Sequence, residues 1–176
     1  MGESGRVGCI FTSTKPLKLK KPLYIGEFEA KLDDKGRVVI PAGLKKQLPK
    51  DTMGKMVVNR GFEKCLTLYT RRDWDVELEG LGHLNHFNKK HRQFIRQFSN
   101  GATEVQADKA SRILIPKKLV EYAEIEGEAV FYAYGNRIEI WSKKLYDEMM
   151  DVDADDFSDL AEDVMGGSPG KERDDE

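Results

Sequence analysis

The stretch GEFEAKLDDKGRVVIPAGLKKQL at residues 26–48 returns in altered form as GATEVQADKASRILIPKKLVEYA at residues 101–123. At an offset of 75 positions, seven residues are identical: Gly26/Gly101, Glu29/Glu104, Asp33/Asp108, Arg37/Arg112, Ile40/Ile115, Pro41/Pro116 and Leu44/Leu119. Downstream, CLTLYTRRDW at 65–74 resembles RIEIWSKKLY at 137–146. Two stretches in register, in the same order, indicate a tandem duplication.

Each copy begins with the pattern of a β-hairpin. Residues 28–33, FEAKLD, alternate apolar with charged side chains, the period of a half-buried strand. A tight loop follows, in which Gly36 can supply the positive φ that such turns require. The chain returns through the β-branched run at 37–40, which favours a second strand pairing with the first.

The rest of each unit is expected to repeat one scheme. Pro41 opens a short helix to about Leu48, because its fixed φ suits a first helical turn. Thr70, with Asp73 three residues later, is typical of a helix N-cap. Ser142 is the corresponding cap, before a helix reaching about Met165. Further strands are predicted near 55–59 and 65–69, and in the second unit at 101–107, 112–115, 128–134 and 137–141.

The domain organisation follows from the duplication. Apolar residues at helical spacing within 84–100 predict an amphipathic helix between the halves. Four short strands and one helix leave an open apolar face, so we expect the repeats to pair about a pseudo-twofold axis into one mainly β (α+β) body. The expected segments are a disordered extension at 1–22, a first repeat at 23–82, a connecting helix at 83–100, a second repeat with a C-terminal helix at 101–165, and a disordered acidic tail at 166–176.

The charge is divided along the chain. Residues 147–176 hold 13 Asp/Glu and 2 Lys/Arg, whereas the remaining residues hold 27 basic and 18 acidic side chains. A basic body with an acidic end suits a protein that meets a polyanion, although a solvated surface with a disordered tail is the alternative. Two cysteines, Cys9 and Cys65, predict no disulfide framework. No apolar run approaches the roughly 18 residues of a membrane span. Because so few cysteines fit a reducing compartment and the basic body suits a polyanion, we expect a cytoplasmic, nucleoid-associated protein.

The shared element is Asp-x-x-x-Arg, followed by three apolar residues and Pro. Here the chain resembles the MraZ family of the AbrB-like swapped-hairpin group, over residues 23–165 and including GNRIEIWS at 135–142. The resemblance implies a double-split β-barrel, a homo-oligomeric ring, and a transcriptional repressor that binds short direct repeats upstream of the division and cell-wall gene cluster. It also implies that the two loops bind double-stranded DNA, through Asp33, Arg37, Asp108 and Arg112.

The chemistry of the loops supports the same reading independently. Arg37 follows a hairpin tip, and its planar guanidinium can reach a guanine edge or lie between phosphates, with Asp33 fixing its direction. Lys35 and Lys109 add charge for phosphates, which position a loop without reading sequence. The alternative is that the pair only stabilises the hairpin. Because a left-handed Ser is strained, Ser111 is expected to adopt a different turn from Gly36, so the halves would contact DNA unequally.

Other features point to no further site. His83, His86 and His91 match no closed zinc set, and the chain holds no nucleophile–base pattern or Gly-rich phosphate loop. We therefore expect no enzyme, no cofactor and no metal. The aromatic residues Tyr69, Trp74 and Trp141 are expected to pack in the core or between subunits rather than to stack on bases.

The acidic run at 151–163 lacks EF-hand spacing, and it is expected to be a solvated helix face or an internal competitor for the DNA site.

Two other functions stay open. One alternative function is an antitoxin-like protein of the AbrB fold, whose acidic tail occupies a toxin. The other is an assembly protein with no nucleic-acid role, against which the basic body and the twin arginines argue.

Overall fold

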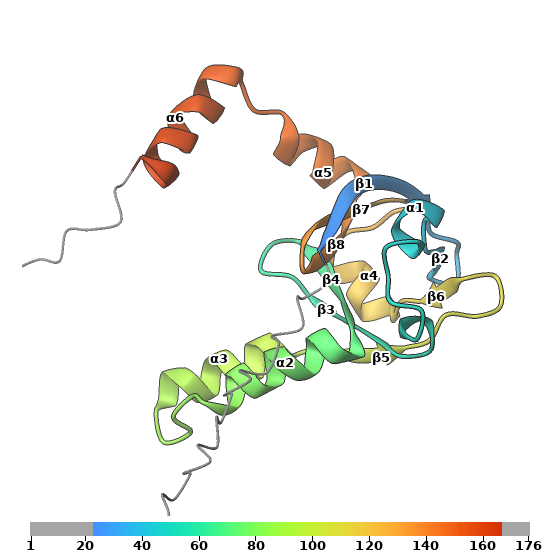
Figure 1. The fold of residues 1–176 in the computed structure, drawn as a ribbon, viewed down its shortest axis with the longest axis horizontal. Helices are drawn as coiled ribbons and strands as arrows, with labels where there is room; N and C mark the ends of the chain where they lie inside the picture. The colour runs from blue at the N-terminus through green and yellow to red at the C-terminus, as the bar shows by residue number, and fades with distance from the viewer. Residues whose placement is uncertain (1–22, 167–176) are drawn as a thin grey trace, which may run out of the picture.

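Both copies of the duplicated sequence fold into the same succession of elements in the computed structural model, which describes residues 23–166 (Figure 1). The disorder expected at 1–22 and in most of the tail lies outside the described residues. The first copy contributes β1 (Tyr24–Lys31), β2 (Arg37–Val39), α1 (Ala42–Lys45), the 3-10 turn η1 (Thr52–Gly54), β3 (Met56–Arg60), β4 (Cys65–Thr70) and α2 (Arg71–Gly82). After α3 (Lys89–Ser99), the second contributes β5 (Thr103–Val105), β6 (Arg112–Leu114), α4 (Lys117–Tyr122), β7 (Glu128–Gly135), β8 (Arg137–Ser142), α5 (Lys143–Met150) and α6 (Ala154–Met165).

The strand pairing is symmetric between the two copies. One antiparallel sheet has the order β1-β7-β8-β4-β3-β5, and β2 pairs with β6 in a second, two-stranded sheet. When each strand is replaced by its duplicate, the order of the larger sheet stays the same but is read from the opposite end. The duplicate residues Val38 and Ile113 face each other across the small sheet, and Thr67 faces Glu139 across the large one. The register therefore places a local pseudo-twofold axis at each of these two pairs.

The hairpin expected within each copy is replaced by pairing between copies. β1 pairs along its whole length with β7, from Tyr24↔Gly135 to Lys31↔Glu128. Only the bridge Leu32↔Val38 joins the end of the first strand to β2. The prediction of a local two-stranded ladder was therefore wrong, because alternation encodes which face of a strand is buried and not which strand lies beside it. The described strands form an open sheet, ending at β1 and β5, and the closed double-split barrel stays a prediction.

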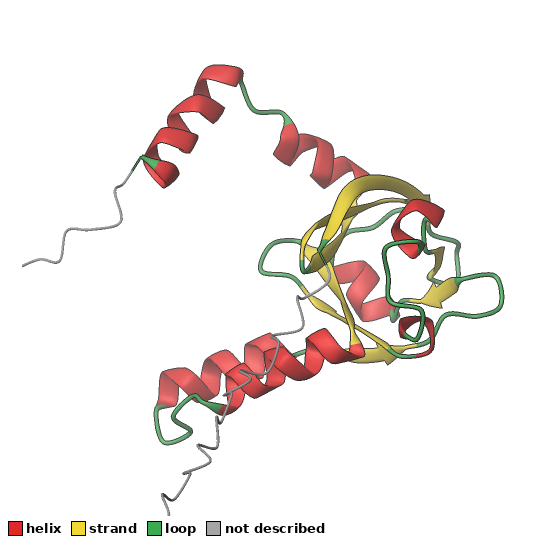
Figure 2. Cartoon of the chain, in the orientation of Figure 1, coloured by secondary structure: helices red, strands yellow, loops and turns green. Residues whose placement is uncertain are grey.

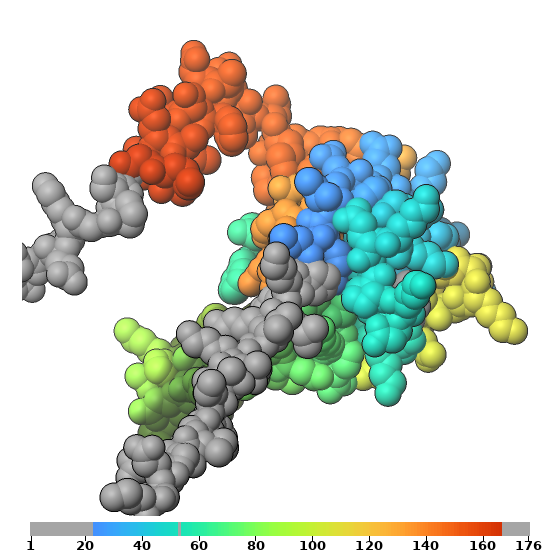
Figure 3. All heavy atoms as spheres, viewed as in Figure 1, coloured from blue at the N-terminus to red at the C-terminus, as the bar shows by residue number. Residues whose placement is uncertain are grey.

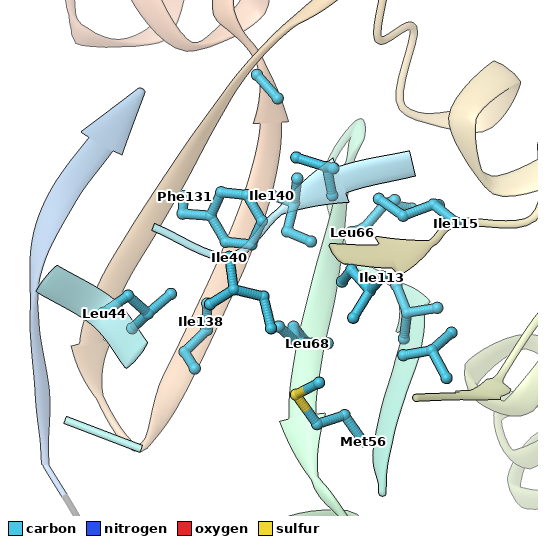
Figure 4. Packing of buried hydrophobic residues seen from close by; sticks show 14 of the residues in the cluster. Ile40, Leu44, Met56, Leu66, Leu68, Ile113, Ile115, Phe131, Ile138 and Ile140 are labelled. Atoms are coloured by element: carbon cyan, nitrogen blue, oxygen red, sulfur yellow. The ribbon is translucent and has the colours of Figure 1, made fainter. Parts of the chain in front are cut away.

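One hydrophobic core is shared by both copies (Figure 4). The duplicate residues Ile40 and Ile115 are each 1% exposed, and Phe131 at the centre is fully buried. A buried side chain of this size contributes about 1.5–3 kcal/mol relative to an exposed one. Because the core combines residues of both copies, neither copy could bury its apolar face alone. The aromatic residues Tyr69, Trp74 and Trp141 are also buried, which confirms that they pack internally.

The helix boundaries agree with the predictions in part. Thr70 caps α2 as expected, since its Oγ1 accepts a hydrogen bond from the Asp73 amide at 3.1 Å and donates one to Asp73 Oδ2 at 2.6 Å. Ser142 stands at the cap of α5, but its side chain makes no capping hydrogen bond. The helix after Pro41 is shorter than predicted and ends at Lys45. The connecting helix begins at Lys89, where Asn88 Oδ1 accepts from the Lys90 amide at 2.9 Å.

The single helix expected to reach Met165 is two helices. It is interrupted at residues 151–153, and α6 starts afresh with Asp153 as its cap, accepting from the Asp155 amide at 2.9 Å. Aspartates compete for backbone hydrogen bonds in helix interiors and favour caps, which explains the break.

Two helical parts project from the β body on the side away from the small sheet. Figure 2 shows α2 and α3 running side by side out of the body. Trp74 of α2 stacks on Phe98 of α3, with 5.8 Å between the ring centroids. In the space-filling view of Figure 3, α6 stands clear of the body. Within residues 23–166, no helix is long and apolar enough to cross a membrane.

Candidate nucleic-acid interface

The two predicted loops meet at the small sheet formed by β2 and β6. Val38 and Ile113 at its centre point into the core and are 1% and 0% exposed. Alternation along each three-residue strand therefore turns the flanking residues outward. In the register, Arg37 faces Leu114 and Val39 faces Arg112, so the two arginines lie on one outward face, diagonally across the ladder. Diagonal neighbours of this kind are roughly 7–8 Å apart.

The first loop holds its arginine through one carboxylate. Asp33 Oδ1 accepts hydrogen bonds from the backbone amides of Lys35, at 3.0 Å, and of Arg37, at 2.9 Å. Asp33 Oδ2 accepts from Arg37 Nε, at 2.7 Å, and lies 2.7 Å from Nη2. The turn closes through Asp33 N donating to Arg37 O and Gly36 N donating to Asp33 O, each at 2.9 Å. The same side chain thus shapes the turn and aims the guanidinium.

The second loop repeats this arrangement bond for bond. Asp108 Oδ1 accepts from the amides of Ala110 and Arg112, both at 2.9 Å, and Oδ2 accepts from Arg112 Nε at 2.8 Å. Ser111 N donates to Asp108 O at 2.9 Å. The arginine side chains of the two loops are exposed to a similar degree, 37% in the first and 41% in the second.

The prediction that Ser111 would force a different turn was wrong. Ser111 adopts a φ of +59°, in the same left-handed region as Gly36 at +81°. Its Oγ accepts a hydrogen bond of 2.6 Å from Lys45 Nζ, a contact that offsets part of the strain. Gly36 has less room, since a Cβ there would lie 2.8 Å from the Ile115 carbonyl oxygen. A side chain is therefore tolerated in the second loop and excluded from the first.

Both carboxylates are held in the charged form. The backbone amide of Arg37 lowers the pKa of Asp33 below its ordinary value of 3.8, with the Arg37 side chain and the Lys35 amide adding to the effect. The Arg112 amide is likewise the main cause of the lowered pKa of Asp108. Both pairs therefore stay ionised at neutral pH, and each arginine is fixed in direction with part of its guanidinium exposed.

The remaining loop residues surround this face. Lys35 and Lys109 are exposed at the two tips, and neither forms an ion pair within the described residues. Sequence reasoning missed three contributors. Val39 and Leu114 are 49% and 56% exposed between the arginines, although they sit in apolar runs. The signal available in the sequence was that each of them stands next to a residue that points into the core, so that its own side chain points outward. Lys45, which ties α1 to Ser111, gave no sequence signal.

Comparison with known proteins identifies relatives across most of the chain. Two consecutive segments, residues 23–97 and 98–166, each match the family model of the MraZ protein, described as antitoxin-like. A protein named transcriptional regulator MraZ from Christiangramia forsetii is 44% identical over 143 residues, covering 81% of this chain and 92% of the relative. The protein of the same name from Flavobacterium psychrophilum is 41% identical, covering 81% and 91%. That from Cytophaga hutchinsonii is 39% identical, covering 79% and 92%. These names describe regulators and not enzymes.

Proposed function

Because this chain belongs to the MraZ family, we propose that it is a sequence-specific DNA-binding transcriptional regulator that acts through its two Asp-x-x-x-Arg loops. The observation that carries the proposal is the pair of duplicate arginines on the outward face of the β2–β6 ladder, each aimed by its own aspartate. An ion pair that only stabilised a turn would not need to occupy the same place on one exposed face in both copies.

The geometry suits a β-ribbon in the major groove. That groove is about 12 Å wide and admits a two-stranded ribbon. Arg37 and Arg112 would read guanine edges, where the fork of the guanidinium matches two acceptors, while Lys35 and Lys109 would contact phosphates on either side. The exposed side chains of Val39 and Leu114 would lie against the bases, and apolar groups there can contact thymine methyls. The face thus combines positioning contacts with reading contacts.

We further propose, from what the resemblance implies, that it acts as a repressor on short direct repeats of a division and cell-wall gene cluster, in association with the nucleoid. One small sheet reads only a few base pairs, which is too little to select an operator among the competing sites of a genome. We propose that several copies assemble into a ring and engage successive repeats, because linked sites raise affinity by about 10²–10⁴ when their spacing matches.

A second candidate function is that of an antitoxin. The family description as antitoxin-like favours it, and so does α6, whose acidic and apolar residues are all exposed in the single chain. In that case α6 would occupy a toxin while the loops still bound DNA. A non-DNA-binding assembly protein is the third possibility.

An electrophoretic shift titration tests the proposal on DNA with repeated and with scrambled sites, across a salt series. We expect tighter binding to the repeated sites at every salt concentration, and a fall of affinity with salt that reports the phosphate contacts. Equal affinity for both DNAs would refute sequence-specific binding. No binding to either would leave the assembly role as the better account.

A further inference from the structure

The last helix of the described chain exposes an apolar stripe that no other part of residues 23–166 covers. Phe157, Leu160 and Val164 fall on one side of α6 at helical spacing, and they are 65%, 56% and 68% exposed. Every residue from 151 to 166 is exposed. A 12-residue helix without tertiary support is marginal in water. The helix therefore has the properties of an element that is completed by a partner.

A groove of matching character lies where α3 meets the β body. Its cavity of about 270 Å³ is lined by the aromatic residues Phe62, Phe94 and Phe98, together with Arg60 and Arg137. Phe62 is 69% exposed and Phe94 is 44% exposed, so the rim is open to solvent. This volume is sufficient to hold one large apolar side chain.

The groove is also basic. Arg60 Nε is buried and has no hydrogen-bond partner among the described residues, although the guanidinium stacks over the Tyr122 ring at 4.7 Å. Among the described residues, Arg137 forms one ion pair, with Glu77 at 4.0 Å, and none of those that line the cavity carries a carboxylate. The adjoining helix α3 carries four Lys/Arg residues and no acidic one. A buried donor without an acceptor is costly, so this groove favours a negatively charged occupant.

The charge of α6 complements that of the groove. The helix carries five Asp/Glu residues and no Lys or Arg, with a sixth carboxylate at its cap. Asp156 and Asp163 flank the apolar stripe along one edge, as expected from their helical positions. Apolar side chains entering the cavity would therefore bring carboxylates towards the arginines that line it.

We propose that α6 of one copy docks into the groove between α3 and the β body of a second copy, with Phe157 and Leu160 as its anchors. Residues 23–166 of one chain leave both surfaces uncovered, and their complementary charge and apolar character point to a second copy as the occupant. This contact rests on the proposed function, because it would join neighbouring copies in the proposed ring. It lies on the side of the body away from the proposed DNA-binding face (Figure 1). Because helix and groove are different surfaces, the contact is head-to-tail, the kind that generates a ring when its rotation closes.

Two variants of the full chain test this contact without DNA. The α6 variant carries Phe157→Asp and Leu160→Asp, and the groove variant carries Phe62→Asp and Phe94→Asp; all four side chains are exposed. Light scattering on a sizing column should give an assembly of several chains for the unaltered protein. Each variant alone should fall to the mass of one chain, 20.1 kDa. Mixed in equal amounts they should form a two-chain species, since one still offers a helix and the other still offers a groove.

Two controls keep the test on the docking surfaces. Leu23→Asp, at an apolar residue 77% exposed outside both surfaces, should leave the assembly unchanged. Phe94 and Phe62 both pack near Phe98, with ring centroids 6.0 Å and 6.4 Å away, so Phe62→Asp alone serves as a milder groove variant that keeps the Phe94–Phe98 contact. Circular dichroism of each variant should match the unaltered chain.

Each contrary outcome overturns the proposal in a distinct way. A single-chain mass for the unaltered protein would exclude docking of α6 on a second copy. Assembly of the groove variant alone would indicate that α6 helices pair with each other. Failure of the mixed variants to combine would show that α6 and the groove do not bind each other. A failure of the loops to bind DNA, in contrast, would bear only on the proposed function.

Discussion

Replacing Arg37 by alanine separates a DNA-reading arginine from a turn-stabilising one. The guanidinium contacts only the Asp33 carboxylate within the described residues, and its side chain is 37% exposed. The turn itself is held by backbone amides that donate to Asp33 Oδ1 and O, and alanine retains all of them. We therefore expect the melting temperature to change by less than about 4 °C.

The expected loss in DNA binding is much larger. A bidentate contact with a guanine contributes about 1–3 kcal/mol of discrimination, which corresponds to roughly 5- to 150-fold in affinity for one site. In a multisubunit assembly every copy loses the contact, so binding to an operator with several repeats should become undetectable. Since both loops have the same geometry, Arg112→Ala should weaken binding to a similar extent.

The assay is a fluorescence-anisotropy titration on specific and scrambled DNA, alongside thermal unfolding. Arg71→Ala is the matched control, because Arg71 also pairs with carboxylates, Asp75 at 3.0 Å and Glu104 at 2.8 Å, but lies on α2. It removes the same charge away from the loops and should leave specific affinity nearly unchanged. Unchanged affinity in Arg37→Ala, Arg112→Ala and their double variant would refute the site. A large drop in stability with normal binding would show that the pair serves the turn alone.

Gly36→Ala should lower the free energy of unfolding by more than about 1 kcal/mol, because the added Cβ would meet a carbonyl oxygen at a residue with positive φ. Ser111→Gly should not lower it, and equal denaturation midpoints for the two variants would contradict this. Thr70→Ala should cost about 0.5–2 kcal/mol in urea unfolding through loss of the α2 cap, and an unchanged midpoint would exclude that role. Because the pKa values of Asp33 and Asp108 are lowered, both ion pairs should stabilise the fold above pH 3.8 and lose this contribution as the pH falls through the lowered values. Chemical shifts of the two carboxyl groups should record this titration, and a pKa at or above 3.8 would contradict the geometry. Several in-phase repeats should bind much more tightly than one, and inserting about half a helical turn between them should abolish the gain; equal affinities would exclude the ring-on-repeats mechanism.

The duplicated motif, the strand alternation and the cap at Thr70 could all be read from the chain. Each is a local property: a period of two, a side chain that caps its own helix, or a repeated run of residues. The break after Met150 was also local, but the prediction passed over Asp151 and Asp153 as helix residues. The pairing of the repeats about a pseudo-twofold axis was expected from the duplication, whereas the two loops were expected to differ. The prediction for Ser111 was wrong because the hydrogen bond from Lys45 offsets part of the backbone strain at this residue.

The sequence by itself determined that there are two copies, which residues face the core, and which side chains carry the loop chemistry. The tertiary structure decided that β1 pairs with β7, that β2 pairs with β6, and that both arginines share one outward face. The physical reason is that alternation specifies the buried face of a strand, whereas its neighbour is chosen by which pairing buries most apolar surface and satisfies most backbone groups at once. In this chain, that pairing joins the two copies across their shared core, and it could not be read from either copy alone.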